Sequence, residues 1–593
     1  MKTIAEPEEL ALGTSLPPGD HHGVSVHLPN WQDTVGWASR EPRVLDAMKT
    51  GYPRFFIHRI VLGLAMRLLE RLRSGENAPG SKEPEERLAV ILSSIRHGQL
   101  CRKALIEWST QREGHTTCSS AGIGIYIVTW EGRISAVEDN EECLNELAQN
   151  RSIGEEDIIL VSYPFELAME AKSFWQHTGF GNSSRRATHW LEHAPFLNPQ
   201  VPETTLPSPA ERRHSVGKAR AALKKRIAAG HSSNTFTVSP NNVFLFLTGM
   251  TAIVETADAI KTLRSATTDS PYRVAVFGFL YVDTFKVLHR VLGYEPTLYK
   301  YTTSDLDALE AALLFSSSSS PSSSSPTQTP PKFDAIITEF PGNPLLQSPD
   351  LTRLHALAQR HGAVLVVDDT VGTYTSLNLL QHCDAIVTSL TKMFSGGCNV
   401  MGGSVALNPD SPHQSSLKEV LENKQDEEAE RAWFWEDVLV MEENSRDFAA
   451  RVHQASGNAE VVVGLLRASE VVREVFYPLG APTQDVYDRY RVEGGKYGFL
   501  LSIRFTSPAR AVAFYNALDV AKGPSLGTNF TLCCAYTLLA HYKELEWAAE
   551  YGVVEDLVRI SVGLEEREWL EMRVQKALRA AEEGMDIFRR VGT

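Results

Sequence analysis

Lys392 lies in the segment Ser389-Leu390-Thr391-Lys392, between an apolar run and a glycine-rich stretch that extends from Gly396 to Gly403. A lysine amine can condense with an aldehyde, and the hydroxyls of Ser389 and Thr391 can donate hydrogen bonds to a phosphate beside it. The cofactor that has both groups is pyridoxal phosphate. The alternative is a surface lysine, because lysine beside serine and threonine before a glycine loop is also common away from active sites.

A second signal is the segment 363–370, Ala-Val-Leu-Val-Val-Asp-Asp-Thr, which is typical of a buried strand that ends in two acids. The carboxyl end of a parallel strand points into the crevice where such folds bind ligands. We therefore expect Asp368 to pair with a protonated pyridine nitrogen. The alternative is that Asp368 and Asp369 cap the turn that follows the strand.

Strand-like runs alternate with helical or irregular segments between about residues 236 and 410. This alternation predicts an α/β fold in which helices cover a mostly parallel sheet. A serine-, proline- and threonine-rich stretch, 316–330, interrupts it, and we expect a disordered surface insertion there because the stretch has little apolar surface to bury. The predicted strands are 243–247, 274–277, 335–338, 364–367 and 385–389.

The regions on either side have different patterns, so we divide the chain into three regions. Residues 1–235 mix amphipathic helical stretches such as 60–69 with strand-like runs such as 123–128. Residues 236–410 form the predicted large domain. Residues 411–593 contain the helical stretches 417–435 and 569–590 around the strand-like run 497–505, which predicts a smaller α+β C-terminal domain.

Composition limits the function classes. The 593 residues are 43% hydrophobic and 22% charged, as in an ordinary globular protein, and the net charge of −15 argues against a nucleic-acid surface. Seven scattered cysteines show no metal-ligand spacing, so we expect no metal site and a reduced, intracellular chain. The first residues lack the pattern of a targeting peptide and no apolar run reaches membrane-spanning length, which predicts a cytoplasmic protein without membrane partners.

The order of several motifs resembles the cystathionine gamma-synthase family, the Cys/Met-metabolism branch of the aspartate-aminotransferase-like, fold-type-I PLP enzymes. That resemblance implies a seven-stranded large-domain sheet. Phrases at 51–58 and 174–179 resemble the fungal branch, which has an extended N-terminal region. The motifs are Thr248-Gly249-Met250, Tyr281-Val282-Asp283-Thr284-Phe285, Glu339-Phe340-Pro341-Gly342-Asn343-Pro344, Asp368-Asp369-Thr370, Ser389-Leu390-Thr391-Lys392, Val400-Met401-Gly402-Gly403 and Arg559-Ile560-Ser561-Val562-Gly563-Leu564-Glu565.

The resemblance gives each candidate residue a role. Lys392 binds the cofactor and shuttles protons, Asp368 pairs with the pyridine nitrogen, and Tyr281 stacks on the ring and assists proton transfer. Arg559 binds the substrate α-carboxylate, since a planar guanidinium matches a carboxylate in two places; a surface arginine on a strand edge is the alternative. We also expect Thr531 to contact substrate. The remaining predicted cofactor-binding residues are Gly249, Met250, Asn343, Ser389 and Thr391.

Two features of the resemblance stay open. Family members complete the phosphate site with a Tyr-x-Arg from a neighbouring subunit, which implies a homodimer or homotetramer. Tyr52-Pro53-Arg54 fits this pattern, and Ser183-Ser184-Arg185-Arg186 is its rival. The family's Gly-His-Ser-Asp loop is Gly396-Gly397-Cys398-Asn399 here, which leaves substrate preference undetermined.

The resemblance implies replacement of the acyl group of an O-acyl-L-homoserine by L-cysteine, which gives L-cystathionine on the route to methionine. The acyl group, the nucleophile and the choice between replacement and elimination stay open. The alternatives are an O-acetylhomoserine sulfhydrylase, a secondary-metabolite gamma-substitution enzyme or a cystathionine lyase. From another class, the chain could be a non-catalytic PLP-fold protein that binds partners.

Overall fold

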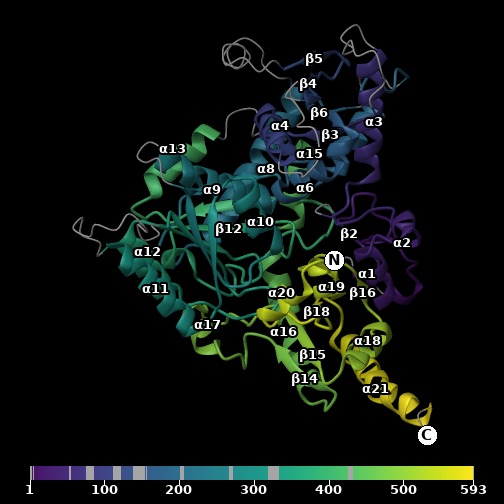
Figure 1. Ribbon diagram of the computed structural model, residues 1–593, viewed down its shortest axis with the longest axis vertical. Helices are drawn as coiled ribbons and strands as arrows, with labels where there is room; N and C mark the ends of the chain where they lie inside the picture. Colours follow the sequence, from purple (N-terminus) through teal and green to yellow (C-terminus); the bar gives the residue numbers. More distant parts are fainter. Residues whose placement is uncertain are drawn as a thin grey trace.

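Three larger β-sheets with their helices follow one another along the chain (Figure 1), after a two-stranded sheet of β1 (Ser15–Leu16) and β2 (Ser25–Val26). The computed structural model describes all residues except 1–2, 5, 53–54, 75–85, 111–121, 138–153, 155, 201–205, 266–270, 318–332, 425–431 and 592–593. Most of the predicted insertion 316–330 therefore lies outside the described residues. Among the helices that the structure describes, none has an apolar stretch sufficient to cross a membrane.

The central sheet has seven strands in the order β7-β13-β12-β11-β10-β8-β9. Its neighbouring strands are parallel except for β13, which is antiparallel to both β12 and β7. The predicted α/β class with a mostly parallel seven-stranded sheet is therefore confirmed. The strands are β7 (Val243–Phe246), β8 (Arg273–Phe277), β9 (Glu295–Tyr299), β10 (Ala335–Glu339), β11 (Val364–Asp368), β12 (Ala385–Ser389) and β13 (Gly403–Leu407).

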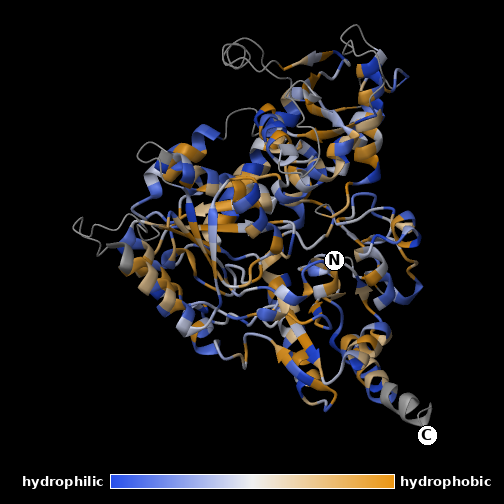
Figure 2. Ribbon diagram, viewed as in Figure 1, coloured by the Kyte–Doolittle hydropathy of each residue, from blue (hydrophilic) through white to orange (hydrophobic). Residues whose placement is uncertain are grey.

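Both faces of this sheet are covered, because alternate residues of each strand enter opposite cores. In β10, Ile336 belongs to the core under helices α8 (Pro209–Gly230), α11 (Thr303–Ser317) and α12 (Leu351–His361). The next residue, Ile337, belongs to the core under α9 (Gly249–Ser265) and α10 (Val282–Arg290). Continuous apolar strands such as β10 are expected when both faces are buried. Figure 2 shows hydrophobic colour along these strands and mixed colours on the helices around them.

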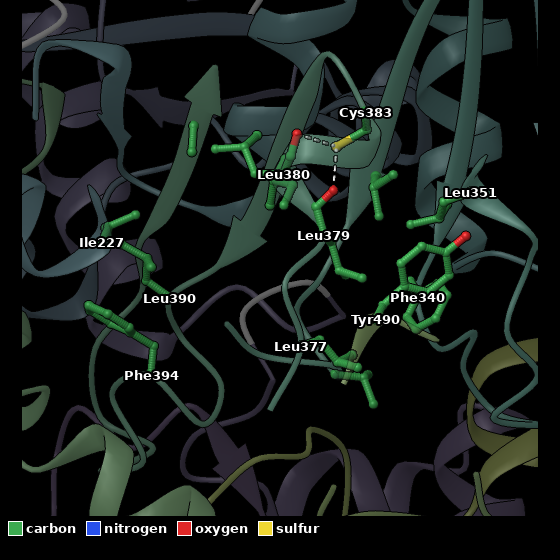
Figure 3. Close-up of a cluster of buried hydrophobic side chains, with 14 of the residues drawn as sticks. Ile227, Phe340, Leu351, Leu377, Leu379, Leu380, Cys383, Leu390, Phe394 and Tyr490 are labelled. Carbon is green, nitrogen blue, oxygen red and sulfur yellow. Dashed lines mark hydrogen bonds between the residues drawn. The ribbon is translucent and has the colours of Figure 1, made fainter. Parts of the chain in front are cut away.

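Figure 3 shows the region of the core that supports the loop after β12. Leu390 and Phe394, which flank Lys392 in sequence, pack in the same core as Ile227 of α8. The thiol of Cys383 donates to the carbonyls of Leu379 and Leu380 at 3.6 and 3.8 Å. Close packing on both sides of residue 392 fixes the backbone from which that lysine extends.

The N-terminal sheet has four strands in the order β3-β6-β4-β5 and forms a layered unit at the top of Figure 1. Helix α6 of this unit contacts both α9 and α10, so its core is continuous with one face of the central sheet. Its elements are α3 (Arg59–Ser74), β3 (Arg87–Leu92), α4 (Ile95–Thr110), β4 (Gly124–Val128), β5 (Ile134–Ala136), β6 (Ile158–Pro164), α6 (Ala168–Thr178) and α7 (Ser184–His193).

The C-terminal sheet has five strands in the order β14-β15-β18-β17-β16, and its helices include α16 (Phe448–Arg467), α18 (Pro508–Ala517), α19 (Tyr536–His541) and α21 (Arg567–Val591). This is the predicted smaller α+β domain. The strands are β14 (Val472–Phe476), β15 (Leu500–Phe505), β16 (Ala521–Lys522), β17 (Leu532–Ala535) and β18 (Val558–Ser561).

The beginning of the chain packs on the C-terminal domain, which it precedes by several hundred residues. Helix α1 (Trp31–Ala38) contacts α18 and α19, and the ring of Trp31 meets that of Tyr515 edge to face. Helix α8, which also falls within the predicted N-terminal region, belongs to the central core. Residues 1–235 thus pack against all three larger sheets. The part of the chain before α3, here called the N-terminal segment, lies close to the carboxyl edge of the central sheet.

Candidate active site

A cavity lies where the carboxyl ends of β10, β11 and β12 meet the C-terminal domain and the N-terminal segment. Lys392 and Asp368, the two side chains on which the sequence interpretation depends, line this one cavity. Tyr536 and Thr370 also line it and were not predicted. The predicted residues in its wall, besides Lys392 and Asp368, are Tyr52, Gly249, Met250, Tyr281, Asn343, Ser389, Thr391 and Arg559.

The amine of Lys392 is held by two uncharged hydroxyls. Its Nζ donates to Tyr52 Oη at 2.8 Å and to Ser525 Oγ at 3.0 Å, and it lies 4.4 Å from the centroid of the Tyr52 ring. The lysine is 8% exposed. Because both partners are hydroxyls and not carboxylates, they do not hold the amine in an ion pair. The amine can therefore react with an aldehyde.

The two acids at the end of β11 face different surroundings. Asp368 lines the cavity, and its Oδ1 accepts from the backbone N–H of Thr370 at 2.9 Å. Removal from water raises the pKa of Asp368, whereas the bonds from Thr370 and the charge of Lys392 lower it. Asp369 turns away and accepts from Thr388 Oγ1 at 2.5 Å, and burial raises its pKa to about 7. Of the two acids, Asp368 is the one available to a ligand in the cavity.

Glu339 is a third acid of the site, and the sequence interpretation did not assign it a role. It ends β10 directly opposite Asp368 in the register of the two strands. Its carboxylate accepts from the backbone N–H groups of Tyr281 at 2.5 Å and Asn343 at 3.0 Å. Burial, with the charge of Asp368 beside it, raises the pKa of Glu339 well above its usual range. The sequence does contain a signal for this acid, because Glu339 ends an apolar strand just as Asp368 does.

The start of α9 forms one corner of the cavity. Gly249 and Met250 begin the helix, and Ser389 and Thr391 stand across from them. A Cβ on Gly249 would lie 2.6 Å from the Cβ of Ser389, so only glycine allows the two segments to approach this closely. Free backbone N–H groups at a helix N-terminus, together with hydroxyl donors, form a phosphate site.

Arg559 extends into the cavity from β18, an inner strand of the C-terminal sheet, and is 5% exposed. Its guanidinium donates to Asn343 Oδ1 at 2.9 Å and to the carbonyl of Ser525 at 2.8 Å, and it lies 4.8 Å from the Tyr536 ring centroid. It is therefore not the surface arginine of the alternative interpretation. A buried guanidinium held by neutral acceptors can bind a carboxylate through two parallel hydrogen bonds.

Ser525 is a further contributor that the sequence interpretation missed. It bonds Lys392 through its hydroxyl and Arg559 through its carbonyl, and its backbone φ is +96°. A positive φ in a residue other than glycine costs free energy and is frequent at functional sites. The small-residue segment 523–528 was the only trace of this turn in the sequence.

Thr531 is predicted to contact substrate, and the structure places it away from the cavity. Its hydroxyl donates to Glu565 at 2.8 Å and accepts from the backbone of Gly563. The hydroxyl of Thr531 is therefore already bonded inside the C-terminal domain. Arg54 lies outside the described residues. Its neighbour Tyr52 reaches Lys392 within the same chain, whereas the resemblance implies a tyrosine from a neighbouring subunit.

The rival segment Ser183–Arg186 lies beside the cavity and not in its wall. Arg185 pairs with Asp437 and donates to the carbonyl of Asn399 at 3.1 Å, while Arg186 donates to the carbonyl of Asp157 at 2.6 Å. The bonds of Arg185 join the N-terminal unit to the rest of the chain. Cys398, in the divergent loop, is 1% exposed in a small apolar cluster, and burial raises its thiol pKa to about 12.

Comparisons with known proteins agree with this geometry. Residues 242–579 match the family model described as Cys/Met metabolism PLP-dependent enzyme, and residues 60–183 match the fungal trans-sulfuration enzyme N-terminal domain. The chain is 32% identical to a cystathionine gamma-synthase of Neurospora crassa, over 96% of this chain and 98% of that protein.

It is also 34% identical to a cystathionine gamma-synthase-like enzyme, iboG1, of Amanita muscaria, over 97% of this chain and 98% of that one. A crystal structure of cystathionine gamma synthase from Xanthomonas oryzae pv. oryzae in complex with cystathionine has a TM-score of 0.51 and 21% identity. The superposition covers 63% of this chain and 88% of that one and shows a likeness in fold.

The donors of the cavity fit pyridoxal phosphate. Lys392 would bind its aldehyde, Asp368 would face its pyridine nitrogen, and the start of α9 with Ser389 and Thr391 would hold its phosphate. Asn343 and Tyr281 line the space between these groups. Because Gly249 has no Cβ, its backbone approaches Ser389 closely, and both segments can reach one anionic group.

Proposed function

Because the chain belongs to the Cys/Met metabolism PLP-dependent enzyme family, we propose that it replaces the acyl group of an O-acyl-L-homoserine by L-cysteine and so forms L-cystathionine. The observation that supports this most is the buried amine of Lys392 in one cavity with Asp368 and Arg559. A whole-length similarity to a fungal cystathionine gamma-synthase agrees with it. The reaction belongs to transsulfuration toward methionine.

Bound pyridoxal phosphate supplies the aldehyde for the amine and a ring that accepts electrons from the substrate α-carbon. The chain supplies binding and proton transfer. Arg559 binds the α-carboxylate and so places the α-carbon near Lys392. The amine of Lys392, at Nζ, takes the α-proton and moves protons at the β-carbon as the acyl group leaves. The carboxylate of Asp368 keeps the pyridine nitrogen protonated.

The walls of the cavity keep water from the reacting atoms. Phe55 comes from the N-terminal segment, Met401 from the loop before β13, and Leu526 and Leu539 from the C-terminal domain. Apolar walls strengthen the electrostatic effect of Asp368 and Arg559, because the local dielectric is low. Exclusion of water also protects the activated γ-carbon until the thiol of cysteine attacks it.

A second candidate is a gamma-substitution that uses another nucleophile or ends in elimination. The chain is about equally similar to iboG1 and to the Neurospora enzyme, and its loop Gly396-Gly397-Cys398-Asn399 departs from the family pattern. A partner-binding protein without catalysis is a poorer match. Burying Lys392, Glu339 and Arg559 around a cavity costs free energy, and a scaffold would gain nothing from that cost.

The test supplies the purified, cofactor-loaded protein with O-acetyl- or O-succinyl-L-homoserine and either cysteine, sulfide or no nucleophile, and identifies the products by mass spectrometry. Cystathionine from the cysteine reaction supports the proposal. A product that forms only with sulfide, or ketoacid without any nucleophile, supports the second candidate. The control is Lys392→Ala, which should lose the visible absorption of bound cofactor and all three activities; retained turnover would contradict the assignment of the lysine.

A further inference from the structure

The phenol hydroxyl of Tyr281 donates a hydrogen bond to a buried carboxylate. Tyr281 lines the cavity and precedes α10, and its hydroxyl donates to Asp283 Oδ2 at 3.0 Å. Asp283 lies in the first turn of α10 and is 0% exposed.

The other oxygen of Asp283 is held by the N-terminal unit. His177 Nδ1 lies 2.9 Å from Asp283 Oδ1, and Gln176 Nε2 donates to the same oxygen at 3.3 Å. Both residues belong to α6, which lies beside α10 (Figure 1). An ionised carboxylate only accepts, so the Nδ1 of His177 carries the proton in this pair. His177 is 5% exposed, and the contact is therefore shielded from water.

Other titratable groups face this network from three further elements. Glu339 of β10 accepts from the backbone N–H of Tyr281. Tyr536 of α19 feels both Asp283 and Glu339, whose charges add to the rise that burial causes in its phenol pKa, while Arg559 of β18 opposes that rise. Asp283 is therefore one of several charges around Tyr281. It differs from the others in bonding the phenol hydrogen itself.

We propose that Asp283 is a positioning residue that keeps Tyr281 protonated and turns its phenol hydrogen away from the cavity, with His177 of the N-terminal unit fixing the carboxylate. A phenol oxygen has one hydrogen and two lone pairs, so a phenol that donates to Asp283 can act toward any other group only as a hydrogen-bond acceptor. Tyr281 then accepts a hydrogen bond from an amine in the cavity and does not serve as a general base. This inference rests on the proposed function only for the reaction that Tyr281 assists.

The experiment measures Tyr281 in cofactor-free protein, so it does not depend on any substrate. Protein labelled with 3-fluorotyrosine is titrated by ¹⁹F NMR, and Tyr281→Phe identifies the resonance among the 17 tyrosines. A negative charge and a hydrogen bond to the neutral phenol both raise its pKa. We expect the Tyr281 midpoint in the wild type to lie at least ~1 pH unit above that of fluorotyrosines in the urea-unfolded protein.

Asp283→Asn should lower that midpoint by about 1 pH unit or more, because the amide keeps the shape and removes the charge. Asp437→Asn, which removes another buried carboxylate that pairs with Arg185, is the matched control and should leave the Tyr281 resonance in place. An unshifted wild-type midpoint, or equal midpoints in wild type and Asp283→Asn, would overturn the proposal. An unshifted wild-type midpoint overturns the proposal even if Asp283→Asn fails to fold.

Two variants test the role assigned to His177. His177→Asn keeps an N–H donor near the Nδ1 position and should leave the midpoint unchanged. His177→Ala removes that donor, so the carboxylate charge is less shared and the midpoint should rise. Equal midpoints in all three proteins would remove His177 from the proposal. In the loaded enzyme, Asp283→Asn should also shift the alkaline limb of the kcat/KM profile; a changed limb with an unshifted resonance would contradict the mechanism while leaving the proposed reaction intact.

Discussion

Adjacent acids at the end of β11 behave differently because alternate residues of a strand face opposite sides. Asp368 lines the cavity, whereas Asp369 accepts from Thr388 in the protein interior. Asp369 is 1% exposed, and burial raises its pKa to about 7. The cost of burying this acid is therefore a function of pH.

Asp369 gives a prediction about stability. Its folded pKa lies above its unfolded value of 3.8, so the folded state binds more protons between about pH 4 and 7. The free energy of unfolding should fall across this range by on the order of a few kcal/mol as pH rises. Asp369→Asn should lose that component of the pH dependence in urea unfolding of the cofactor-free protein. The exposed Asp410→Asn is the control, and the same slope in both variants would argue against the assignment.

Arg559 gives a prediction about substrate binding. Arg559→Ala should raise KM for the amino-acid substrate roughly 10- to 100-fold, because hydrogen bonds to a charged group are lost, and should leave cofactor content nearly unchanged. Arg559→Lys keeps the charge without the planar pair of donors, so its KM should lie between that of the wild type and that of Arg559→Ala. Steady-state kinetics and cofactor absorbance measure these effects separately. Parallel losses of cofactor and of substrate affinity would speak against a carboxylate-binding role.

At the scale of elements, parallel strands and one helix N-terminus position the site. The carboxyl ends of β10 and β11 place Glu339 opposite Asp368, and the start of α9 faces Ser389 at the end of β12. Ligands of open α/β sheets bind at this edge. The sheet thus explains why acids, hydroxyls and Lys392, separate in sequence, line one cavity.

Gly249 tests the role of the α9 N-terminus. Gly249→Ala should weaken cofactor retention and cost about 1–3 kcal/mol of stability, because the new Cβ would lie 2.6 Å from the Ser389 Cβ. Gly217→Ala is the matched control, since nothing lies within 4 Å of its Cβ position on α8. Dialysis followed by cofactor absorbance measures retention. Full retention by the Gly249 variant would mean that the two segments separate without consequence.

At the scale of the whole molecule, the N-terminal segment closes the cavity over Lys392. The segment packs on the C-terminal domain through α1, and Gly523 approaches the carbonyl of Val26 so closely that a Cβ would lie 2.0 Å from it. Tyr52, 340 residues from Lys392 in sequence, bonds its amine. One chain therefore contains the tyrosine and the lysine of the same site.

This arrangement predicts the outcome of subunit mixing. Chains with Tyr52→Ala and chains with Lys392→Ala, co-expressed with different tags and purified as mixed oligomers, should show no activity beyond that of the separate variants. Each site of the mixture lacks one of the two groups if both come from one chain. Recovery of about a quarter or more of wild-type turnover would show that neighbouring subunits exchange the segment. A wild-type chain paired with Lys392→Ala is the positive control.

Much of the central sheet and the proximity of one acid to the lysine could be predicted from sequence. Apolar runs of four or five residues identified β7, β8, β10, β11 and β12 but neither β13 nor the edge strand β9, whose residues are mostly not buried. The rule that parallel strands end at one edge predicted that Asp368 lies near Lys392. These inferences agree with the structure because they depend on local periodicity and on a general property of the fold. The motif order added Tyr281, Asn343 and Arg559 in the same way.

Contacts between distant segments follow from the way the domains pack. The bond from Lys392 to Ser525, the reach of Tyr52 within its own chain, and the pair of Asp283 with His177 each join segments of the chain that lie more than 100 residues apart. Thr531 lies outside the cavity wall for the same reason, since Glu565 occupies its hydroxyl. Such pairs depend on how whole domains pack, and local residue patterns carry no information about that packing.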